Sequence, residues 1–168
     1  MRSPNVGTND LALAFKSLGE ELASGQTNGD EIEFLVRVEG TPRDLHPITR
    51  EEVYRVAGEA LRNAFQHAQA GRIELAIRYG ERQLGLHVRD NGRGFDPQSG
   101  ELARAGHWGL AGMRERAELI DGQLEVWSDL QSGTEVVLTI PASNAYKNSP
   151  VRRRAPMFSK RQFARTNS

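Results

Sequence analysis

Alternation of apolar and polar residues at a period of two restricts the fold of this chain more than any other feature of its sequence. Such alternation predicts strands with one buried face, and it recurs five times along the chain. Only short turns, the first at Gly80-Glu81, separate the second segment from the third and the fourth from the fifth, so each pair is a predicted hairpin. The predicted strands are residues 31–40, 72–79, 83–90, 123–129 and 134–140.

Three other segments repeat apolar residues at helical spacing. The first covers residues 10–22 and starts with an aspartate that can cap a helix. The longest is predicted to begin at Thr49, with Glu52 completing a capping box, and to stop near Ala70-Gly71, where Gly71 would be a C-terminal glycine. The third covers residues 109–120.

The predicted order is helix, strand, long helix, hairpin, long loop, helix and hairpin. Strands grouped in hairpins, together with helices that must share one face, indicate an α+β fold. We expect a two-layer α/β sandwich whose mixed, mostly antiparallel sheet is covered on one face by helices. Residues 29–143 would form this domain, after an N-terminal part of residues 1–28 and before a tail of residues 144–168.

Composition excludes several classes of protein. The 168 residues include no cysteine, which rules out disulfides, cysteine-ligated zinc and thiol catalysis. No run of about 18 apolar residues is present to span a membrane, and the polar start lacks the apolar stretch of a secretory signal. We therefore expect a cytoplasmic location for this part of the chain.

Charge is divided unevenly, although the net charge of the whole chain is zero. Residues 144–168 carry seven Lys or Arg and no acid, which leaves a net charge of −7 on the residues before them. Two prolines and the lack of periodicity predict a basic, flexible extension. It is either a solvated tail or a segment that binds an anionic surface. Because it has no helix-turn-helix pattern, we expect no nucleic-acid partner.

Three polar residues follow one another at intervals of four on the long predicted helix. Glu59, Asn63 and His67 therefore share one helical face. An amide oxygen suits Mg²⁺, which prefers hard oxygen ligands, and a carboxylate can orient or deprotonate a nearby nucleophile. The trio is either the border of a polar ligand site or a solvent-exposed edge of the helix.

The third predicted strand ends in the sequence DNGRGF, residues 90–95. A carboxylate at this place can accept a hydrogen bond from an exocyclic amine, and glycines at alternate positions allow positive φ and a close approach to a ligand. A simple turn would lead directly into a strand, whereas residues 91–108 contain four glycines and little apolar content. Loops of this length are usually functional or mobile.

The segment GHWGLAGM, residues 106–113, places glycines directly before a predicted helix. Free N–H groups at a helix N-terminus and the helix dipole favour an anion, so phosphate is the expected guest. On its own this segment is equally compatible with a flexible hinge.

The three clusters together resemble the nucleotide-binding motifs of the GHKL ATPase superfamily. EALRNAFQHA is similar to its N box, DNGRGF to its G1 box, and the segment beginning GHWGLAGMRER to its G2 box. The GLAGMRER form is typical of the catalytic domains (HATPase_c) of bacterial sensor histidine kinases that pair with LuxR-like response regulators. The segment IPASNAYKNSPVRRR resembles kinases that carry a β-propeller sensor. The resemblance implies the Bergerat fold of this superfamily.

The resemblance implies a role for each residue of the first cluster in binding ATP and Mg²⁺. Asn63 would hold Mg²⁺ between the ATP phosphates, and His67 would lie near those phosphates. Glu59 would lie near the γ-phosphate and polarise the nucleophile. Glu59 and Asn63 are therefore the expected catalytic residues.

For the base of the nucleotide, the resemblance implies a pocket at the second cluster. Asp90 would accept a hydrogen bond from the adenine amino group, and Thr134 would support it directly or through water. Gly92 and Gly94 would shape the adenine pocket.

On the phosphate side, the resemblance implies binding by the third cluster. Gly109 and Gly112 would line the phosphates, with Leu110 between them also among the nucleotide-binding residues. Residues 96–108 would form a mobile lid over ATP.

Partners outside the chain are implied as well. The kinases of this family transfer the γ-phosphoryl group of ATP to a histidine on a dimeric helical hairpin, and none of the four histidines here lies in such a helix. We expect a monomeric fragment, unable to autophosphorylate, whose residues 1–28 are a remnant of, or linker from, that phosphoacceptor hairpin. The hairpin and a LuxR-like response regulator would be its partners, and the parent kinase would be anchored in the inner membrane.

Two other functions are compatible with the motifs: a stand-alone serine kinase of the anti-sigma-factor type, and a degenerate nucleotide-binding interaction module. Gln66 stands where many relatives have Lys or Arg, which removes one phosphate-facing cation and leaves room for the second alternative. The form of the third motif argues against the serine kinase. Intact Glu59, Asn63 and Asp90 argue against the degenerate module.

Overall fold

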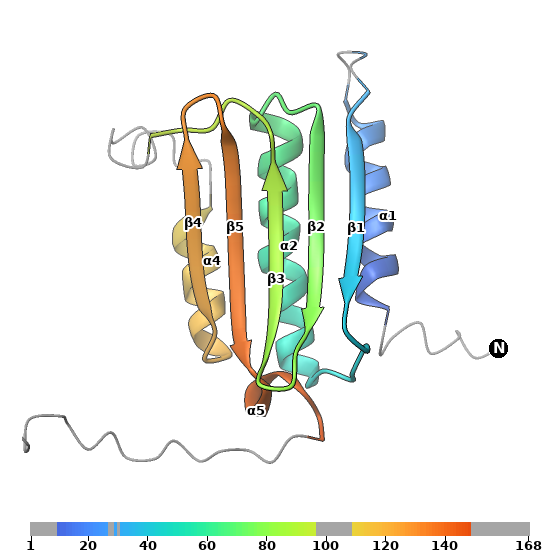
Figure 1. Cartoon of the computed structure of the whole chain (residues 1–168), viewed down its shortest axis with the longest axis vertical. Coiled ribbons are helices and arrows are strands. Elements are labelled where there is room, and N and C mark those ends of the chain that lie inside the picture. Colours follow the sequence, from blue (N-terminus) through green and yellow to red (C-terminus); the bar gives the residue numbers. More distant parts are fainter. Residues whose placement is uncertain (1–9, 27–28, 30, 97–108, 149–168) are drawn as a thin grey trace, which may run out of the picture.

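A computed structural model describes residues 10–26, 29, 31–96 and 109–148 of the chain. Figure 1 shows the elements in these residues. In chain order they are α1 (Leu11–Ser24), β1 (Glu33–Glu39), α2 (Pro47–His67), β2 (Arg72–Tyr79), β3 (Gln83–Asp90), α4 (Leu110–Leu119), β4 (Gln123–Asp129), β5 (Gly133–Pro141) and α5 (Ala142–Ala145).

The five strands form one sheet in the order β1-β2-β3-β5-β4. Strands β1 and β2 are parallel, because α2 carries the chain from one to the other, and the remaining neighbours are antiparallel. Helices α1, α2 and α4 all cover one face, behind the sheet in Figure 1. The predicted two-layer α+β fold with a mixed, mostly antiparallel sheet is therefore confirmed.

The core lies between these helices and the helix-facing side of the sheet. Alternate residues of each central strand point into it, such as Ile73, Leu75 and Ile77 of β2, all fully buried. Phe15 of α1 is also fully buried, so α1 packs in the same core. None of the helices in the described ranges is both long and apolar enough to cross a membrane.

The C-terminal boundary of the packed body lies further along the chain than predicted. Tyr146 is 1% exposed, and its neighbour Ala145 is fully buried. Tyr146 also pairs with Leu45 in an isolated bridge, and its hydroxyl donates to the carbonyl of Gly80 at 2.8 Å. Residues 144–148 therefore belong to the folded body and not to an extension. The rest of the predicted basic tail, residues 149–168, lies outside the described residues.

The predicted start of the long helix at Thr49 is wrong. Helix α2 begins one half-turn earlier, at Pro47, whose fixed φ suits the first helical position. The Thr49 hydroxyl instead donates to the carbonyl of Asn144 at 2.6 Å. No capping box forms, because the Glu52 carboxylate pairs with Arg116 of α4.

The predicted end of this helix at Gly71 is also wrong. Helix α2 ends at His67, and the left-handed residue that follows is Gln69, with φ 51°. Asn91 explains the shift, because its side-chain oxygen accepts hydrogen bonds from the N–H groups of Gly71 and Arg72, at 3.0 and 2.9 Å. This asparagine holds the turn from α2 into β2.

The ion pair between Glu52 and Arg116, at 3.1 Å, ties α2 to α4. The side chain of Glu52 is only 10% exposed and that of Arg116 39%. Replacing Arg116 with methionine leaves a buried carboxylate without its partner, which we expect to lower the free energy of unfolding by about 1–3 kcal/mol. Urea unfolding measures the loss, and the double variant Glu52→Gln/Arg116→Met should recover part of it. Additive losses in the double variant would show that the pair does not couple the two helices.

Candidate functional site

A small pocket lies between α2, α4 and the helix-facing side of β3, β5 and β4. Three of the predicted site residues bring polar groups to it: Asn63 from α2, Asp90 at the end of β3, and Thr134 from β5. A mainly apolar pocket with a few convergent polar groups is typical of small-molecule sites. The other lining residues are Ala60, Ala64, Val88, Phe95, Leu110, Met113, Val126 and Val136.

This pocket is nearly closed. Its cavity volume is about 10 Å³, which is room for about one water molecule. A cavity of this size is too small for a planar base unless lining side chains move. The lid was predicted at residues 96–108. Of these only Asp96 is among the described residues.

Asp90 is the buried acid of the pocket, at 7% exposure. One carboxylate oxygen accepts a hydrogen bond from the N–H of Gly92 at 2.9 Å. Burial raises the pKa of this carboxyl above its ordinary value of 3.8, and hydrogen bonds from the backbone N–H groups of Gly92 and Thr134 oppose the rise. An acid kept here at the cost of desolvation is a candidate for ligand recognition.

Ser128 organises the wall of the pocket beside Thr134, and sequence reasoning missed it. Its hydroxyl oxygen lies 2.8 Å from that of Thr134, donates to the Gly133 carbonyl at 3.2 Å, and accepts from the N–H of Phe95 at 2.9 Å. The sequence did contain a pattern that could have identified Ser128. It follows Val126 by two residues, so the two side chains lie on the same, helix-facing side of β4.

Gly92 and Gly94 contact the protein's own backbone. A Cβ at Gly92 would lie 2.1 Å from the Ala68 carbonyl oxygen, and one at Gly94, where φ is +60°, would lie 2.0 Å from that of Asp129. These glycines join the end of β3 to the C-terminal end of α2 and to the β4–β5 turn. Neither glycine lines the pocket. Their effect on the pocket is therefore indirect, through the position of the backbone that carries Asp90 and Thr134.

Glu59 and His67 lie outside the pocket lining, on the same face of α2 as Asn63. The Glu59 carboxylate lies against Gly109, where an added Cβ would be 2.8 Å from its Oε1. Its other oxygen pairs with Arg62 at 3.2 Å. The structure therefore places Glu59 at the start of α4.

The N-terminus of α4 carries no side-chain cap. Its N-cap residue, Gly109, is left-handed with φ +59° and has no side chain to accept from the first turn. Such N–H groups and the helix dipole favour an anion. Leu110 turns toward the pocket, while Gly112 is exposed.

Gly112 offers a test of the phosphate side. A Cβ there would meet nothing within 4 Å, so Gly112→Ala should raise the free energy of unfolding by about 0.5–1 kcal/mol through helix propensity. If the phosphates approach this backbone, nucleotide affinity should fall in the same variant. Urea unfolding and a nucleotide titration measure the two effects separately. Unchanged affinity would remove Gly112 from the site.

The donor set suits a magnesium ion held jointly with a substrate. No group of three or more His, Cys, Asp or Glu side chains in the described part of the chain could hold a metal. Mg²⁺, however, is commonly bound by one or two protein oxygens, with substrate phosphates and waters completing its shell. The amide of Asn63, at 7% exposure, fits such a site.

Comparison with known proteins gives consistent results. Residues 48–144 match the family described as histidine kinase-, DNA gyrase B- and HSP90-like ATPase. The sensor histidine kinase YdfH of Bacillus subtilis is 42% identical over 94 residues, which cover 55% of this chain and 23% of that protein. The oxygen sensor histidine kinase NreB of Staphylococcus carnosus is 38% identical over 92 residues, covering 55% and 26%.

Another relative covers more of the chain. The signal transduction histidine-protein kinase/phosphatase DegS of Bacillus subtilis is 29% identical over 113 residues, covering 67% of this chain and 29% of that protein. This chain thus spans less than a third of each of these curated relatives. The histidine kinase domain of a blue-light activated kinase from Erythrobacter litoralis has the same fold, with a TM-score of 0.63 and 23% identity over 78% of this chain and 60% of that chain.

Proposed function

Since this chain belongs to the family of histidine kinase-, DNA gyrase B- and HSP90-like ATPases, we propose that it is the ATP-binding catalytic part of a two-component sensor histidine kinase. It would transfer the γ-phosphoryl group of ATP to a histidine of a phosphoacceptor hairpin, an element that is not among the described residues. The sensor kinases among its relatives support this assignment within the family.

The observation that carries the proposal is the common pocket of Asp90 and Asn63. A carboxylate and an amide from facing elements meet there in a mainly apolar lining, and such convergent polar groups are typical of small-molecule sites. Asp90 would accept from the adenine amino group, with Thr134 and Ser128 fixing the wall beside it. Gly92 and Gly94 would set the position of this wall through their backbone contacts.

The phosphates would lie between Asn63 and the uncapped N-terminus of α4 at Gly109, with His67 and Gly112 at the border. Magnesium, when bound, neutralises charge between the phosphates, and the side-chain oxygen of Asn63 would hold it. The protein's task in such a reaction is mainly to position groups and stabilise charge.

Glu59 would act on the acceptor. In the transfer, the bond from the γ-phosphorus to the bridging oxygen breaks and its electron pair leaves with ADP. A bond forms between phosphorus and one imidazole nitrogen, while Glu59 accepts the proton of the other nitrogen. The position of Glu59 at Gly109, where the γ-phosphate would lie, supports this role.

Several finer assignments belong to the same proposal. The downstream partner would be a LuxR-like response regulator, and the parent kinase would carry a β-propeller sensor and a membrane anchor, with this part on the cytoplasmic side. The chain would consist of an N-terminal part of residues 1–28, the ATP-binding domain and a basic tail. Because Tyr146 is buried, the tail would start at residue 149 and not at residue 144.

Transfer itself can be tested with γ-labelled ATP and the phosphoacceptor hairpin of a sensor kinase relative. The proposal predicts label on the hairpin that is stable in base and labile in acid, as for phosphohistidine. Acid-stable label on a hydroxyl side chain would favour the serine kinase of the anti-sigma-factor type. Binding without any transfer would favour the degenerate module.

Asn63→Ala tests the magnesium assignment. We expect it to weaken nucleotide binding by about tenfold in the presence of Mg²⁺, which corresponds to about 1.4 kcal/mol, and to change it little without the ion. Calorimetry on both proteins, with Mg²⁺ or with a chelator, measures the difference. Equal losses in the two conditions would assign Asn63 to the nucleotide and not to the metal.

A further inference from the structure

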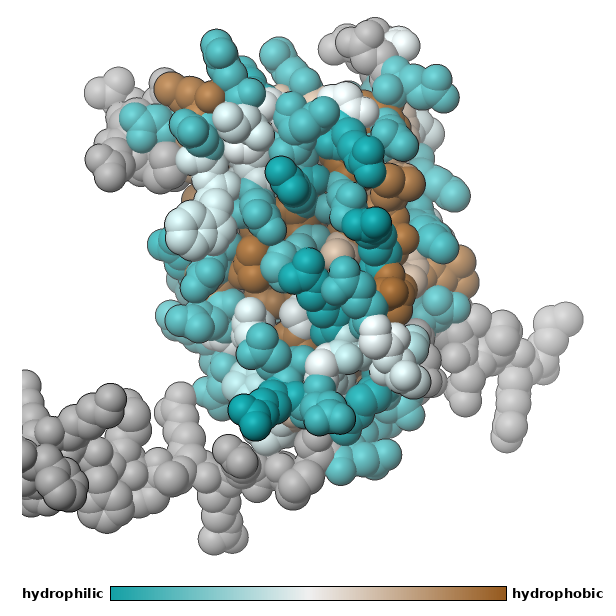
Figure 2. Space-filling model, in the orientation of Figure 1, coloured by the Kyte–Doolittle hydropathy of each residue, from teal (hydrophilic) through white to brown (hydrophobic). Residues whose placement is uncertain are grey.

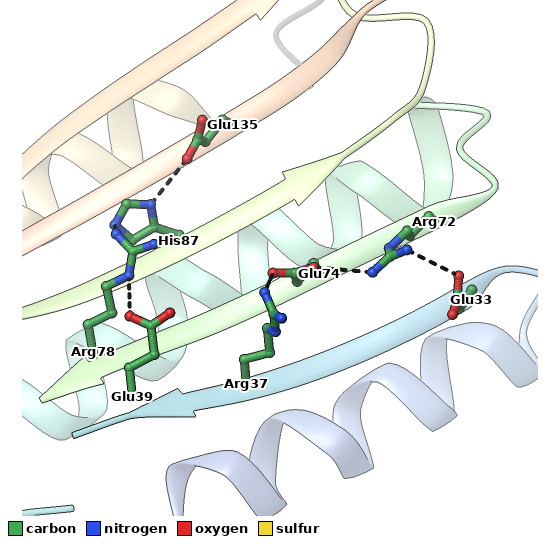
Figure 3. A network of polar contacts seen from close by, with 8 residues as sticks. All are labelled: Glu33, Arg37, Glu39, Arg72, Glu74, Arg78, His87 and Glu135. Atoms are coloured by element: carbon green, nitrogen blue, oxygen red, sulfur yellow. Dashed lines mark hydrogen bonds and ion pairs between the residues drawn. The ribbon is translucent and has the colours of Figure 1, made fainter. Parts of the chain in front are cut away.

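The face of the sheet opposite the helices is open, and most of it is hydrophilic in Figure 2. Over β1 and β2 its charges are arranged in ion pairs, which Figure 3 shows. Arg37 lies 3.3 Å from Glu74, and Arg78 lies 2.8 Å from Glu39. This part of the face is electrically balanced by its own side chains.

Strand β4 gives the same face a different character. Its Trp127 is 62% exposed. Alternation along β4 turns Val126 and Ser128 toward the helices and Trp127 away from them. A large aromatic residue thus stands on a sheet face that no described element covers.

Carboxylates surround this indole. Glu125 and Asp129 lie two residues away on either side and on the same face of β4, and Glu135 is the residue paired with Trp127 on β5. Among the residues that the structure describes, Glu125 and Asp129 form no ion pair, while Glu135 contacts His87 at 3.1 Å. We call Trp127 with these three acids the tryptophan patch.

Beside the patch is a shallow hollow of about 260 Å³. Trp127, Asp129 and Glu135 line it together with Asp90, Thr134 and the β4–β5 turn, and Arg89 is the only cation among the lining residues that the structure describes. An exposed indole face attracts cations, and Arg or Lys over tryptophan is the favoured form of this contact. The patch therefore fits a segment that carries several cations and no acid.

We propose that this chain's own residues 158–165, FSKRQFAR, bind the tryptophan patch. The segment holds three cations, Lys160, Arg161 and Arg165, two phenylalanines and no acid, so it complements both the charge and the aromatic surface. It lies outside the residues that match the ATPase family. The hollow shares Asp90 and Thr134 with the lining of the nucleotide pocket, whereas Trp127 and Glu135 lie outside that lining.

The length of the chain permits this contact and selects the segment. Tyr146 lies at the Gly80 turn, beside the end of β5 that holds Pro141. Glu135 is six residues away along β5, or about 20 Å. From Asn148 an extended chain reaches about 17 Å at Arg153 and about 40 Å at Lys160. The reach at Lys160 exceeds the distance of about 20 Å to Glu135, whereas the reach at Arg153 does not.

Fluorescence of Trp127 tests the proposal in the full chain, with Trp108→Phe as background so that one tryptophan emits. We expect Lys160→Glu/Arg161→Glu to increase acrylamide quenching of Trp127, since loss of a single cation–π contact lowers the equilibrium constant for the bound segment by about twofold or more. The matched control, Arg152→Glu/Arg153→Glu, makes the same charge change out of reach and should leave quenching unaltered. The difference should vanish at about 1 M salt, where screening acts over about 3 Å.

A second pair of variants tests the patch itself. Glu125→Gln/Asp129→Asn should increase quenching as the tail variant does, whereas Glu20→Gln/Glu21→Gln, which removes two exposed acids of α1, should not. Equal quenching in the full chain and the Lys160/Arg161 variant would overturn the proposal. So would an effect that grows with protein concentration, because the segment would then bind another copy.

Discussion

Replacing Asp90 with asparagine should weaken ATP binding by about 30- to 150-fold. This loss corresponds to about 2–3 kcal/mol, the cost of leaving two buried hydrogen-bond donors facing each other without an acceptor. Asparagine retains an oxygen that can accept from the Gly92 N–H, as Asp90 does at 2.9 Å. Its amide nitrogen would then face the adenine amino group, where the carboxylate had offered a second acceptor. The loss therefore falls on recognition of the base.

Stability should not fall in the same variant. Burial raises the pKa of the Asp90 carboxyl above 3.8, so the folded state holds this proton to higher pH than the unfolded state does. The free energy of unfolding then decreases as pH rises from 3.8 through the raised value, and the ionised group destabilises the fold at neutral pH. The amide introduced by Asp90→Asn carries no such charge, so urea unfolding at pH 7 should show equal or greater stability.

Asp129→Asn is the matched control, because Asp129 is an exposed acid at the same end of the sheet. Calorimetric titration of both variants with an ATP analogue separates the two acids. The adenine assignment fails if Asp90→Asn binds as tightly as the original chain, or if Asp129→Asn loses as much affinity.

Replacing Gly94 with alanine should lower the free energy of unfolding by about 2–5 kcal/mol. Two causes add together at this position. An alanine at φ +60° is in the left-handed region, at a cost of about 1–2 kcal/mol. Its Cβ would also lie 2.0 Å from the Asp129 carbonyl oxygen, and relieving such overlap in packed structure costs about 1–3 kcal/mol.

Gly29 separates these causes, because its φ is +67° and a Cβ there would meet nothing within 4 Å. Gly29→Ala should therefore lose only the conformational share, about 1–2 kcal/mol at most. Urea unfolding of the two variants gives both numbers. Equal losses would mean that the close approach of Gly94 to the β4–β5 turn contributes nothing to stability.

The fold was predictable where local pattern and tertiary packing agree. Alternation located the strands, and helical spacing located α1, α2 and α4. The predictions failed where a distant partner decides the local structure. Thr49 resembles a helix cap, yet its hydroxyl is used by Asn144, 95 positions away. Gly71 resembles a helix end, yet Asn91 fixes that turn from the end of β3.

The candidate site was predictable in part for the same reason. Spacing placed Glu59, Asn63 and His67 on one face of α2, but only tertiary packing brings Asn63 to Asp90 and Thr134. The motif glycines were expected to approach a ligand, and the structure shows Gly92 and Gly94 against the protein's own backbone. Side-chain hydrogen bonds between strands, such as those of Ser128, leave little trace in one sequence.

The central claim, that the pocket of Asp90 and Asn63 binds ATP with magnesium, is tested most directly by calorimetry of the purified chain. A non-hydrolysable ATP analogue would be titrated with and without Mg²⁺, and a GTP analogue would serve as the control for the base. We expect saturable binding that strengthens with Mg²⁺ and prefers adenine. Absence of binding, or equal binding of both bases, would contradict it.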